Sequence, residues 1–316
     1  MGQGRTTDSP SFYLTEVSPR DKPWDKHRKN ADVVKGLYLG SELSRYGERI
    51  ARCSEQLGFA LEAEDSGEIK LRLKQARFCR VRYCPVCQWR KTLVWRARLI
   101  NALPKVAEDY PKARWIFLTL TVRNCPLPEL RSTVEDMNKS WRRLMGRKQF
   151  PAKGFIRSLE VTRNPETNEA HPHFHILMMV SPSYFGGANY VSQESWREIW
   201  GSCLKVDYLP VVHVQTVKNK SKADLPLIDA ILETAKYGVK ESDLMFDSEW
   251  LQELTLQLHK VHCVTLGGIL KNYLKEDETD NLINTDENDV DTIKENESIL
   301  LWFDWREQIK RYSKRS

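Results

Sequence analysis

Three histidines in the segment AlaHisProHisPheHisIleLeu carry the clearest chemical signal of this sequence. Side chains of a β-strand alternate between its two faces, so His173 and His175 would lie side by side on one face. Glu160 stands inside a second strand-like run, SerLeuGluValThr, where burying a carboxylate is costly unless a cation compensates it. Two imidazoles and a carboxylate are donors that a divalent metal accepts. The pattern therefore predicts a divalent metal site formed by His173, His175 and Glu160.

The third ligand of this site has alternatives. His171 shares the face of His173, but it precedes Pro172 at the start of the strand, so it is either a substitute ligand or a group near a bound phosphate. His213 and Gln215 share a face of a later strand and are weaker candidates. Histidines without any metal are the competing interpretation. Three of them so close together, beside a strand with a carboxylate, favour the metal site.

A second pattern, GluThrAlaLysTyrGlyValLys, lies in the helix predicted over residues 226–240. Glu233 and Tyr237 are four residues apart and therefore share one helix face. The pKa of tyrosine is about 10, so its hydroxyl needs a nearby cation to act as a nucleophile, and Lys236, Lys240 and the metal could supply one. Attack on a DNA phosphate would give a phosphotyrosine, and Glu233 could later activate the water that releases it. Taken alone, the segment also fits an ordinary amphipathic helix with a Glu–Lys pair.

Four cysteines have spacings that suit a structural Zn²⁺ site. Cys84 and Cys87 form a CxxC pair, Cys79 precedes them closely, and Cys53 lies further upstream. A redox CxxC is the competing interpretation, although such a pair normally opens a helix after a strand in a βαβ unit. The remaining cysteines lack metal spacing and are expected to be buried: Cys125, Cys203 and Cys263.

Basic residues surround both the cysteines and the tyrosine, which suggests contact with phosphate groups. Residues 77–98 contain several arginines and a lysine but no acidic side chain. Lysines also flank Tyr237 in its helix. The predicted DNA-contacting residues are Arg77, Arg80, Arg82, Arg90, Lys91, Lys236 and Lys240.

Strands and helices alternate along the part of the chain that would position these residues. Apolar and β-branched runs predict strands at 115–122, 155–162, 173–180 and 211–217. Apolar residues at helical spacing predict helices at 88–103, 127–146, 193–204, 226–240 and 249–274. Pro104 should end or kink the first of these helices. This order indicates an α+β fold in which helices pack on an antiparallel sheet.

Composition suggests how the whole chain is organised. Residues 1–30 are rich in Pro, Ser and charged side chains and should be extended, and short helices are expected soon after them. Residues 276–295 are acidic, which suggests a linker or a DNA-mimicking tail. The predicted parts are an extended arm (1–30), a helical and zinc-knuckle DNA-binding region (31–110), a catalytic domain (111–275), an acidic linker (276–295) and an aromatic C-terminal helix (296–316).

The bulk composition fits a globular protein that meets a polyanion. Hydrophobic residues make up 41% of the 316 residues, and the net charge is +6. The positive charge is concentrated in residues 1–150, which favours nucleic acid as a partner. No apolar run reaches the length of a membrane span, and residues 1–30 lack the apolar core of a signal peptide, so no membrane partner is expected. The clustered, odd-numbered cysteines indicate metal ligation in a reducing cytoplasm.

Taken together, these stretches resemble the replication initiators of small rolling-circle plasmids, the HUH endonuclease branch with one catalytic tyrosine and a glutamate. Residues 18–28 resemble the N-terminal signature of that family, and residues 78–91 resemble its cysteine motif. ProHisPheHisIleLeu (172–177), preceded by ArgSerLeuGluValThr (157–162), resembles the HUH motif, and PheLeuThrLeuThrVal (117–122) fits a core strand. GluThrAlaLysTyrGlyValLys resembles the catalytic helix.

The resemblance spans roughly residues 15–275 and implies a ferredoxin-like or RRM-like catalytic sheet. It implies His173 and His175 as ligands of Mg²⁺ or Mn²⁺, with Glu160 as a less secure third ligand. It implies Tyr237 as the nucleophile and Glu233 in place of a second tyrosine. The implied partners are plasmid origin DNA, at a single-stranded or hairpin nick site, and the host helicase and polymerase.

Two other functions stay open on the sequence. A relaxase or a single-strand transposase would use the same chemistry, although transposases of that kind are shorter and lack a cysteine knuckle. A non-catalytic zinc DNA-binding regulator would explain the cysteines and the basic residues, but it would leave the histidine strand without a role.

Overall fold

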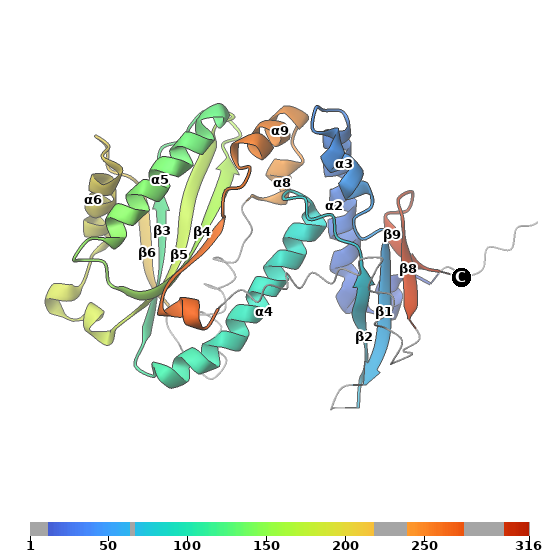
Figure 1. The fold of residues 1–316 in the computed structure, drawn as a ribbon, viewed down its shortest axis with the longest axis horizontal. Helices are drawn as coiled ribbons and strands as arrows, with labels where there is room; N and C mark the ends of the chain where they lie inside the picture. The colour runs from blue at the N-terminus through green and yellow to red at the C-terminus, as the bar shows by residue number, and fades with distance from the viewer. Residues whose placement is uncertain (1–11, 64–66, 218–238, 275–299, 316) are drawn as a thin grey trace, which may run out of the picture. The chain divides into compact units, whose positions relative to one another are not determined.

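The structure is a computed structural model that describes residues 12–63, 67–217, 239–274 and 300–315. The chain forms two compact units (Figure 1). The first unit comprises residues 1–90 and 281–316, and the second comprises residues 91–280. The N-terminal and C-terminal segments thus belong to one unit. The sequence had predicted them as separate parts of the chain.

A four-stranded antiparallel sheet forms the centre of the first unit. Its strand order is β2-β1-β8-β9, and the strands are β1 (Gln56–Ala63), β2 (Ile69–Ala76), β8 (Leu301–Arg306) and β9 (Arg311–Lys314). In the middle of the sheet, Leu57 of β1 lies opposite Phe303 of β8. The sheet therefore closes through a pairing between segments that are far apart in the sequence.

Helix α2 (Lys22–Leu39) packs its buried side chains against the last two strands. The rings of Trp24 and Tyr312 meet edge to face with centroids 6.4 Å apart. The carboxylate of Asp32 pairs with Arg28 at 3.0 Å and accepts a hydrogen bond of 3.0 Å from Nε1 of Trp305. The buried carboxylate of Asp32 is thus paired, as burial requires. The other helices of this unit are α1 (Leu14–Val17), η1 (Pro19–Asp21) and α3 (Ser44–Ala51).

Two expectations for the first unit were wrong. The arm expected to be extended over 1–30 is helical from Leu14 onward in the described residues, because Leu14 and Trp24 are buried in the core. The C-terminal segment expected to be helical is the hairpin β8–β9 instead. Its Phe303 and Trp305 are buried while their neighbours are more exposed, and this two-residue period belongs to a strand.

The second unit is built on a five-stranded sheet in which every neighbouring pair is antiparallel. The strand order is β6-β3-β5-β4-β7. The strands are β3 (Arg114–Thr121), β4 (Ala152–Arg163), β5 (Ala170–Val180), β6 (Val212–Val217) and β7 (Val264–Gly268). Strands β4 and β5 are the longest and lie at the centre, and this central pair carries the predicted metal ligands (Figure 1).

Different helices pack on the two faces of this sheet. Leu99 and Val106 of α4 (Pro85–Asp109) join a hydrophobic core with Phe117 of β3 and Leu177 of β5. On the other face, Trp141 of α5 (Leu130–Met145) packs on Phe155 and Phe174, with ring centroids 5.0 and 6.5 Å away. Helix α6 (Gln193–Leu204) lies next to α5 (Figure 1).

Short helices and turns complete the second unit, namely η2 (Leu127–Glu129), η3 (Pro182–Phe185), η4 (Gly187–Asn189), α8 (Glu241–Leu244), α9 (Ser248–Gln257) and η5 (Ile269–Asn272). Strand β7 ends at Gly268, whose φ is +58° and whose added Cβ would collide with the carbonyl of Lys153. Only glycine therefore fits this close approach of β7 to β4. Within the described residues, no helix combines the length and the apolar character needed to cross a bilayer.

The α+β class and the antiparallel sheet were predicted correctly. The strands expected at 115–122, 155–162, 173–180 and 211–217 are confirmed, as are the helices at 127–146 and 193–204. The helix expected at 249–274 is only partly right, because α9 ends at Gln257 and β7 then pairs with β4. The prediction that the helix ends at Pro104 was wrong, since α4 continues to Asp109 and keeps Val106 in the core.

Candidate metal centres

Three predicted metal ligands converge at the centre of the second unit. Strands β4 and β5 pair so that Glu160 lies directly opposite His173, and His175 follows on the same face. The Nε2 atoms of His173 and His175 lie 3.2 and 2.8 Å from the same carboxylate oxygen, Oε2 of Glu160. All three side chains are buried. The register between two strands thus brings together donors that are far apart along the chain.

The contacts on the far side of each ring show which nitrogen is available to a metal. Nδ1 of His173 lies 3.1 Å from the backbone carbonyl oxygen of His171, which can only accept a hydrogen bond. With its proton on Nδ1, a neutral His173 turns the lone pair of Nε2 toward the carboxylate. That arrangement is stable only if the ring is protonated or a cation lies between the groups. Nδ1 of His175 lies 3.2 Å from Oγ1 of Thr119, and because a hydroxyl can either donate or accept, this contact orients the ring without selecting its tautomer.

The distances between the donor atoms fit a small divalent cation. Metal–ligand bonds of about 2.1 Å at right angles place neighbouring ligand atoms about 3.0 Å apart, as in the octahedral geometry of Mg²⁺. The two measured separations, 3.2 and 2.8 Å, bracket that value. The donor set of Glu160, His173 and His175 is therefore compatible with such an ion, and three ligands would leave coordination positions for water or a phosphate oxygen.

Electrostatics also favours a cation at this position. Burial by itself would raise the pKa of Glu160, but the hydrogen bonds with His173 and His175 outweigh that effect and hold its pKa well below the usual range. The carboxylate is therefore ionised at neutral pH. Burial and the neighbouring His173 lower the pKa of His171, which keeps that ring neutral.

The alternative ligands lie near the centre without joining it. The ring of His171 is 5.2 Å from that of His173, centroid to centroid, but it is not one of the three converging donors. His213 is exposed on β6 and faces Gln215, with Nε2 and Oε1 3.4 Å apart. Strand β3 separates it from β5. Thr119 was missed at the sequence level, although its alternation with Thr121 in an apolar strand marks a polar row on one face.

The predicted nucleophile Tyr237 lies outside the described residues, as do Glu233 and Lys236 of the same predicted helix. Lys240, from the same predicted helix, is described and exposed, and it directly precedes α8.

The four cysteines of the first unit form a second buried cluster. Cys53 follows α3, Cys79 follows β2, and Cys84 and Cys87 lie at the start of α4. Sγ of Cys53 is 3.6 Å from the sulfurs of Cys84 and Cys87, and the sulfurs of Cys79 and Cys87 are also 3.6 Å apart. Zn–S bonds of about 2.3 Å in a tetrahedron give sulfur–sulfur edges of about 3.8 Å. The cluster therefore matches a zinc site and is too open for disulfides, whose sulfurs lie about 2.0 Å apart.

Backbone geometry around Cys79 supports thiolate ligands. The N–H groups of Cys79 and Val81 point at sulfur, toward Cys53 and Cys79 respectively, each at 3.5 Å. Between them, Arg80 takes a left-handed conformation with φ +55°, which turns the chain around the sulfur. Burial raises the pKa of the Cys84 thiol, so four thiolates in this space need a cation to balance them.

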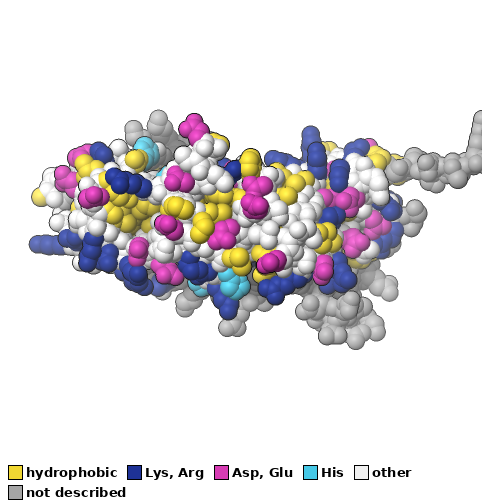
Figure 2. All heavy atoms as spheres, turned by 90° about the horizontal axis from the view of Figure 1, so that it is seen from above, with side chains coloured by type: hydrophobic (Ala, Val, Ile, Leu, Met, Phe, Trp, Pro, Cys, Tyr) yellow, Lys and Arg dark blue, Asp and Glu magenta, His cyan; other side chains and the backbone are white. Residues whose placement is uncertain are grey.

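The predicted DNA-contacting residues near this cluster differ in where they point. Arg77 and Arg80 are exposed, and Arg82 and Lys91 are half-buried. Arg90 instead stacks over the ring of Trp24, with its Cζ 5.4 Å from the centroid, and burial lowers its pKa. On the face shown in Figure 2, Lys and Arg side chains are interspersed with Asp and Glu among the described residues. Within the described part of the chain, positive charge therefore does not form one continuous patch on this face. Burial is confirmed for the cysteines without metal spacing, Cys125, Cys203 and Cys263.

Comparison with known proteins assigns the chain to a family. Residues 70–313 match the family Rep_1, described as replication protein. A "Protein rep" of Streptococcus pneumoniae is 38% identical over 276 residues, which cover 84% of this chain and 83% of the relative. A "Protein rep" of Bacillus amyloliquefaciens is 31% identical and covers 93% of this chain and 94% of the relative. A "Replication protein" of Staphylococcus aureus is 37% identical over 65% of this chain and 93% of the relative.

The chain therefore belongs to the Rep_1 replication protein family. This result confirms the resemblance to plasmid rolling-circle replication initiators that the motifs indicated. The match over residues 70–313 includes both metal-ligand clusters except Cys53. No solved structure matches the chain.

Proposed function

We propose that this replication protein nicks one strand of plasmid origin DNA, remains joined to its 5′ end through Tyr237, and later rejoins or releases the strand. The observation that carries the proposal is the convergence of two histidine Nε2 atoms on one buried carboxylate oxygen of Glu160. A divalent metal held by these donors would supply the chemistry that strand cleavage needs. Family membership supplies the biological setting, which is the start of plasmid replication.

The three donors would hold Mg²⁺ or Mn²⁺, which would polarise the scissile phosphate and offset the charge that develops on it. Glu160 contributes the negative charge, and the two imidazoles contribute directed lone pairs. The carbonyl of His171 fixes the tautomer and the orientation of His173, and the hydroxyl of Thr119 orients the ring of His175. The chain thus arranges its donors before any DNA is bound, which lowers the cost of reaching the transition state.

Tyr237 is the proposed nucleophile. Its phenolate oxygen forms a bond to the scissile phosphorus, the bond from phosphorus to the 3′ oxygen breaks, and that oxygen takes up a proton to become a 3′ hydroxyl. The products are a 5′-phosphotyrosine and a free 3′ end that a polymerase can extend. Rejoining is the reverse reaction, in which a 3′ hydroxyl attacks the phosphotyrosine.

Glu233 is the proposed base for release of the strand. It would take a proton from a water molecule whose oxygen attacks the phosphotyrosine phosphorus, and Tyr237 would leave as its phenolate. Its position four residues before Tyr237 supports this role, because both side chains would then share a helix face.

Zn²⁺ at the cysteine cluster is proposed as a structural ion that shapes a DNA-binding knuckle. The four sulfurs already have the spacing of a tetrahedral site. Arg77 and Arg80 are exposed next to the cysteines in the sequence. The candidates for phosphate contacts at the origin are Arg77, Arg80, Arg82, Lys91, Lys236 and Lys240. Host helicase and polymerase would then act on the opened strand.

The deciding experiment uses the full-length protein and a labelled single-stranded oligonucleotide that contains the nick site. With Mn²⁺ present, the wild type should give a denaturation-resistant protein–DNA band on a gel. Tyr237→Phe should lose that band, and the matched control Tyr190→Phe, an exposed tyrosine of the second unit, should keep it.

The other outcomes identify other proteins. Cleavage that persists in Tyr237→Phe would mean that another residue is the nucleophile. Tight origin binding without any cleavage or adduct would indicate a non-catalytic zinc regulator. Processing of transfer-origin or transposon-end strands in preference to a replication origin would indicate a relaxase or a transposase.

A further inference from the structure

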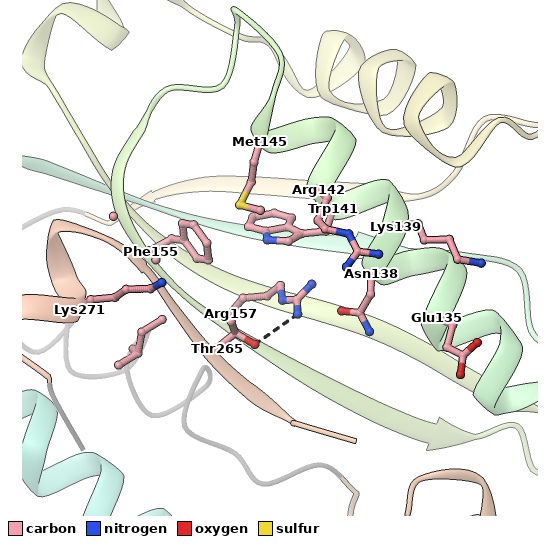
Figure 3. Close-up of a pocket in the computed structure, with 13 residues that line it drawn as sticks. Glu135, Asn138, Lys139, Trp141, Arg142, Met145, Phe155, Arg157, Thr265 and Lys271 are labelled. Carbon is pink, nitrogen blue, oxygen red and sulfur yellow. Dashed lines mark hydrogen bonds between the residues drawn. The ribbon is translucent and has the colours of Figure 1, made fainter. Parts of the chain in front are cut away.

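A pocket of about 660 Å³ lies between helix α5, strand β4 and the end of β7 (Figure 3). It is on the opposite face of the sheet from the histidines, because Arg157 of β4 points to the other side from Glu160. Its lining includes four cations and two aromatic rings, namely Lys139, Arg142, Arg157, Lys271, Trp141 and Phe155. None of these residues belongs to either metal-ligand cluster.

Arg157 is the unusual member of this pocket because it is a buried cation that has no counter-ion within the described residues. Only 7% of the residue is exposed. Its guanidinium stacks on Phe174, with Cζ 4.2 Å from the ring centroid, and Nη2 donates a hydrogen bond of 3.3 Å to Oγ1 of Thr265. Nη1 has no hydrogen-bond partner, and no carboxylate pairs with Arg157 within the described residues. One strong donor is therefore left unpaired.

A second unpaired donor lies beside the first. Nε1 of Trp141 is buried and has no acceptor among the described residues. Figure 3 shows Trp141 and Arg157 pointing toward each other between the helix and the sheet, with Arg142 next to them. Both orphaned atoms are donors, so the group that would satisfy them must be an acceptor.

The charges around the pocket point to an anion. Arg142 and Lys271 are exposed at the rim, and neither makes an ion pair within the described residues. Glu135 is the one carboxylate in the described lining. Burial and the nearby Arg142 lower the pKa of Arg157 to about 10, so the side chain is still charged at neutral pH. Burying the charged guanidinium of Arg157 without a counter-ion is costly, which indicates a ligand that balances its charge.

Packing alone is the competing explanation. The stacking of Arg157 on Phe174 accounts for its burial, as cation–π contacts often do. It does not account for the unpaired Nη1, for the unpaired indole of Trp141, or for two further cations at the same opening.

We propose that this pocket binds a phosphate group, supplied either by a single DNA strand or by a free nucleotide. Phosphate offers several acceptor oxygens and up to two negative charges, which match the donors of Arg157 and Trp141 and the cations Arg142 and Lys271. The volume of about 660 Å³ also leaves space for the sugar and base attached to that phosphate. The site lies on the face away from the histidines and does not depend on the proposed nicking reaction.

The first test measures binding of inorganic pyrophosphate to the full-length protein, without added divalent metal, from the rise in melting temperature with ligand concentration. Arg142→Gln and Lys271→Gln should each weaken binding about tenfold, and Arg157→Met about ten- to hundredfold. The matched control is Lys105→Gln, which removes an exposed charge from α4 and should bind as the wild type does. If Arg157→Met does not fold, the two exposed variants still decide the result.

The second test distinguishes the two sources of phosphate. For a short single-stranded oligonucleotide, the slope of log affinity against log salt should fall by about 0.7 in Arg142→Gln if a strand phosphate occupies the pocket. An unchanged oligonucleotide affinity, with weakened binding of pyrophosphate and deoxynucleoside triphosphates, would identify a nucleotide pocket. The proposal is overturned if all three variants bind both pyrophosphate and the oligonucleotide as the wild type does.

Discussion

The two units each bury a cluster of side chains that could hold a metal ion, but the clusters differ in how completely they would enclose it. The first unit supplies four thiolates, all buried, from a turn, a strand end and a helix start. The second unit supplies only three donors, Glu160, His173 and His175, from two neighbouring strands. A tetrahedral ion among the four sulfurs would have no position left, whereas an octahedral ion at the three donors would keep several.

In proteins this is the difference between structural and catalytic metal sites. Closed sites contribute folding energy, and open sites leave room for water or substrate. The chain thus places a rigid, closed cluster in one unit and an open one in the other. Damage to the cysteine cluster and damage to the histidine–glutamate cluster should therefore have different consequences.

The largest effect is expected from Cys84→Ser. Structural zinc sites contribute apparent binding free energies of about 10–16 kcal/mol in small zinc domains, so loss of one thiolate should release the ion and unfold the first unit. Zinc content by elemental analysis and limited proteolysis of the first unit would measure both consequences. Cys203→Ser, at a buried cysteine outside the clusters, is the matched control and should keep the zinc. A Cys84→Ser protein with unchanged melting temperature would contradict a structural role.

The next largest effect is expected from His175→Ala. Changing groups that merely orient a ligand typically costs about 10–100-fold, so removing a ligand itself should reduce nicking by more than about 100-fold. The zinc content and the fold of the first unit should not change. Single-turnover cleavage with Mn²⁺ would measure this loss, with the exposed His213→Ala as control. Full activity in His175→Ala would remove the histidine strand from the reaction.

A smaller effect is expected from Thr119→Val, which removes the hydroxyl that contacts Nδ1 of His175 and keeps the side-chain volume. The affinity for Mn²⁺ should fall about 10–100-fold because the ring is no longer held in one orientation. The rate at saturating metal should change less. A Mn²⁺ titration of cleavage would separate the two quantities, and Thr216→Val, at an exposed position of β6, serves as control. Equal metal affinity in both variants would show that Thr119 does not position the ring.

The smallest change in stability is expected from Arg80→Gly in the turn around Cys79. Glycine removes the strain of the left-handed backbone but makes the unfolded chain more flexible, so the free energy of unfolding should change by about 1 kcal/mol or less. If Arg80 contacts a phosphate, the salt dependence of binding to duplex origin DNA should fall by about 0.9 in slope. Lys112→Gln, an exposed charge of the second unit, is the control. An unchanged slope would remove Arg80 from the DNA surface.

Most of the sheet in the second unit could be predicted because its central strands are apolar runs. The runs around Phe117 and Leu177 are short and apolar and contain β-branched residues, which favours buried strands over helices. The first unit was harder. Residues 31–110 were expected to be helical around the zinc knuckle, and strands β1 and β2 within them were missed. The alternation of Ile69, Leu71 and Leu73 with charged residues is the signal that could have indicated β2, whereas β1 and β8 are recognisable as partners only once they pair.

The candidate site divides in the same way. Local spacing placed His173 and His175 on one face, and the CxxC pair identified its own ligands. The contact of Thr119 with His175 and the pocket around Arg157 could not be inferred, because each depends on segments that are distant in sequence.

The sequence by itself determined the kinds of donor and their local order, since the two-residue period of a strand puts His173 and His175 together whatever strand lies beside them. Only the tertiary structure decided that Glu160 stands directly opposite His173. A shift of one residue in the β4–β5 register would have turned that carboxylate to the other face. Tertiary structure likewise brought Cys53 to its three partners and paired β8 with β1. These choices follow from hydrogen bonding and burial between distant segments, which no local pattern encodes.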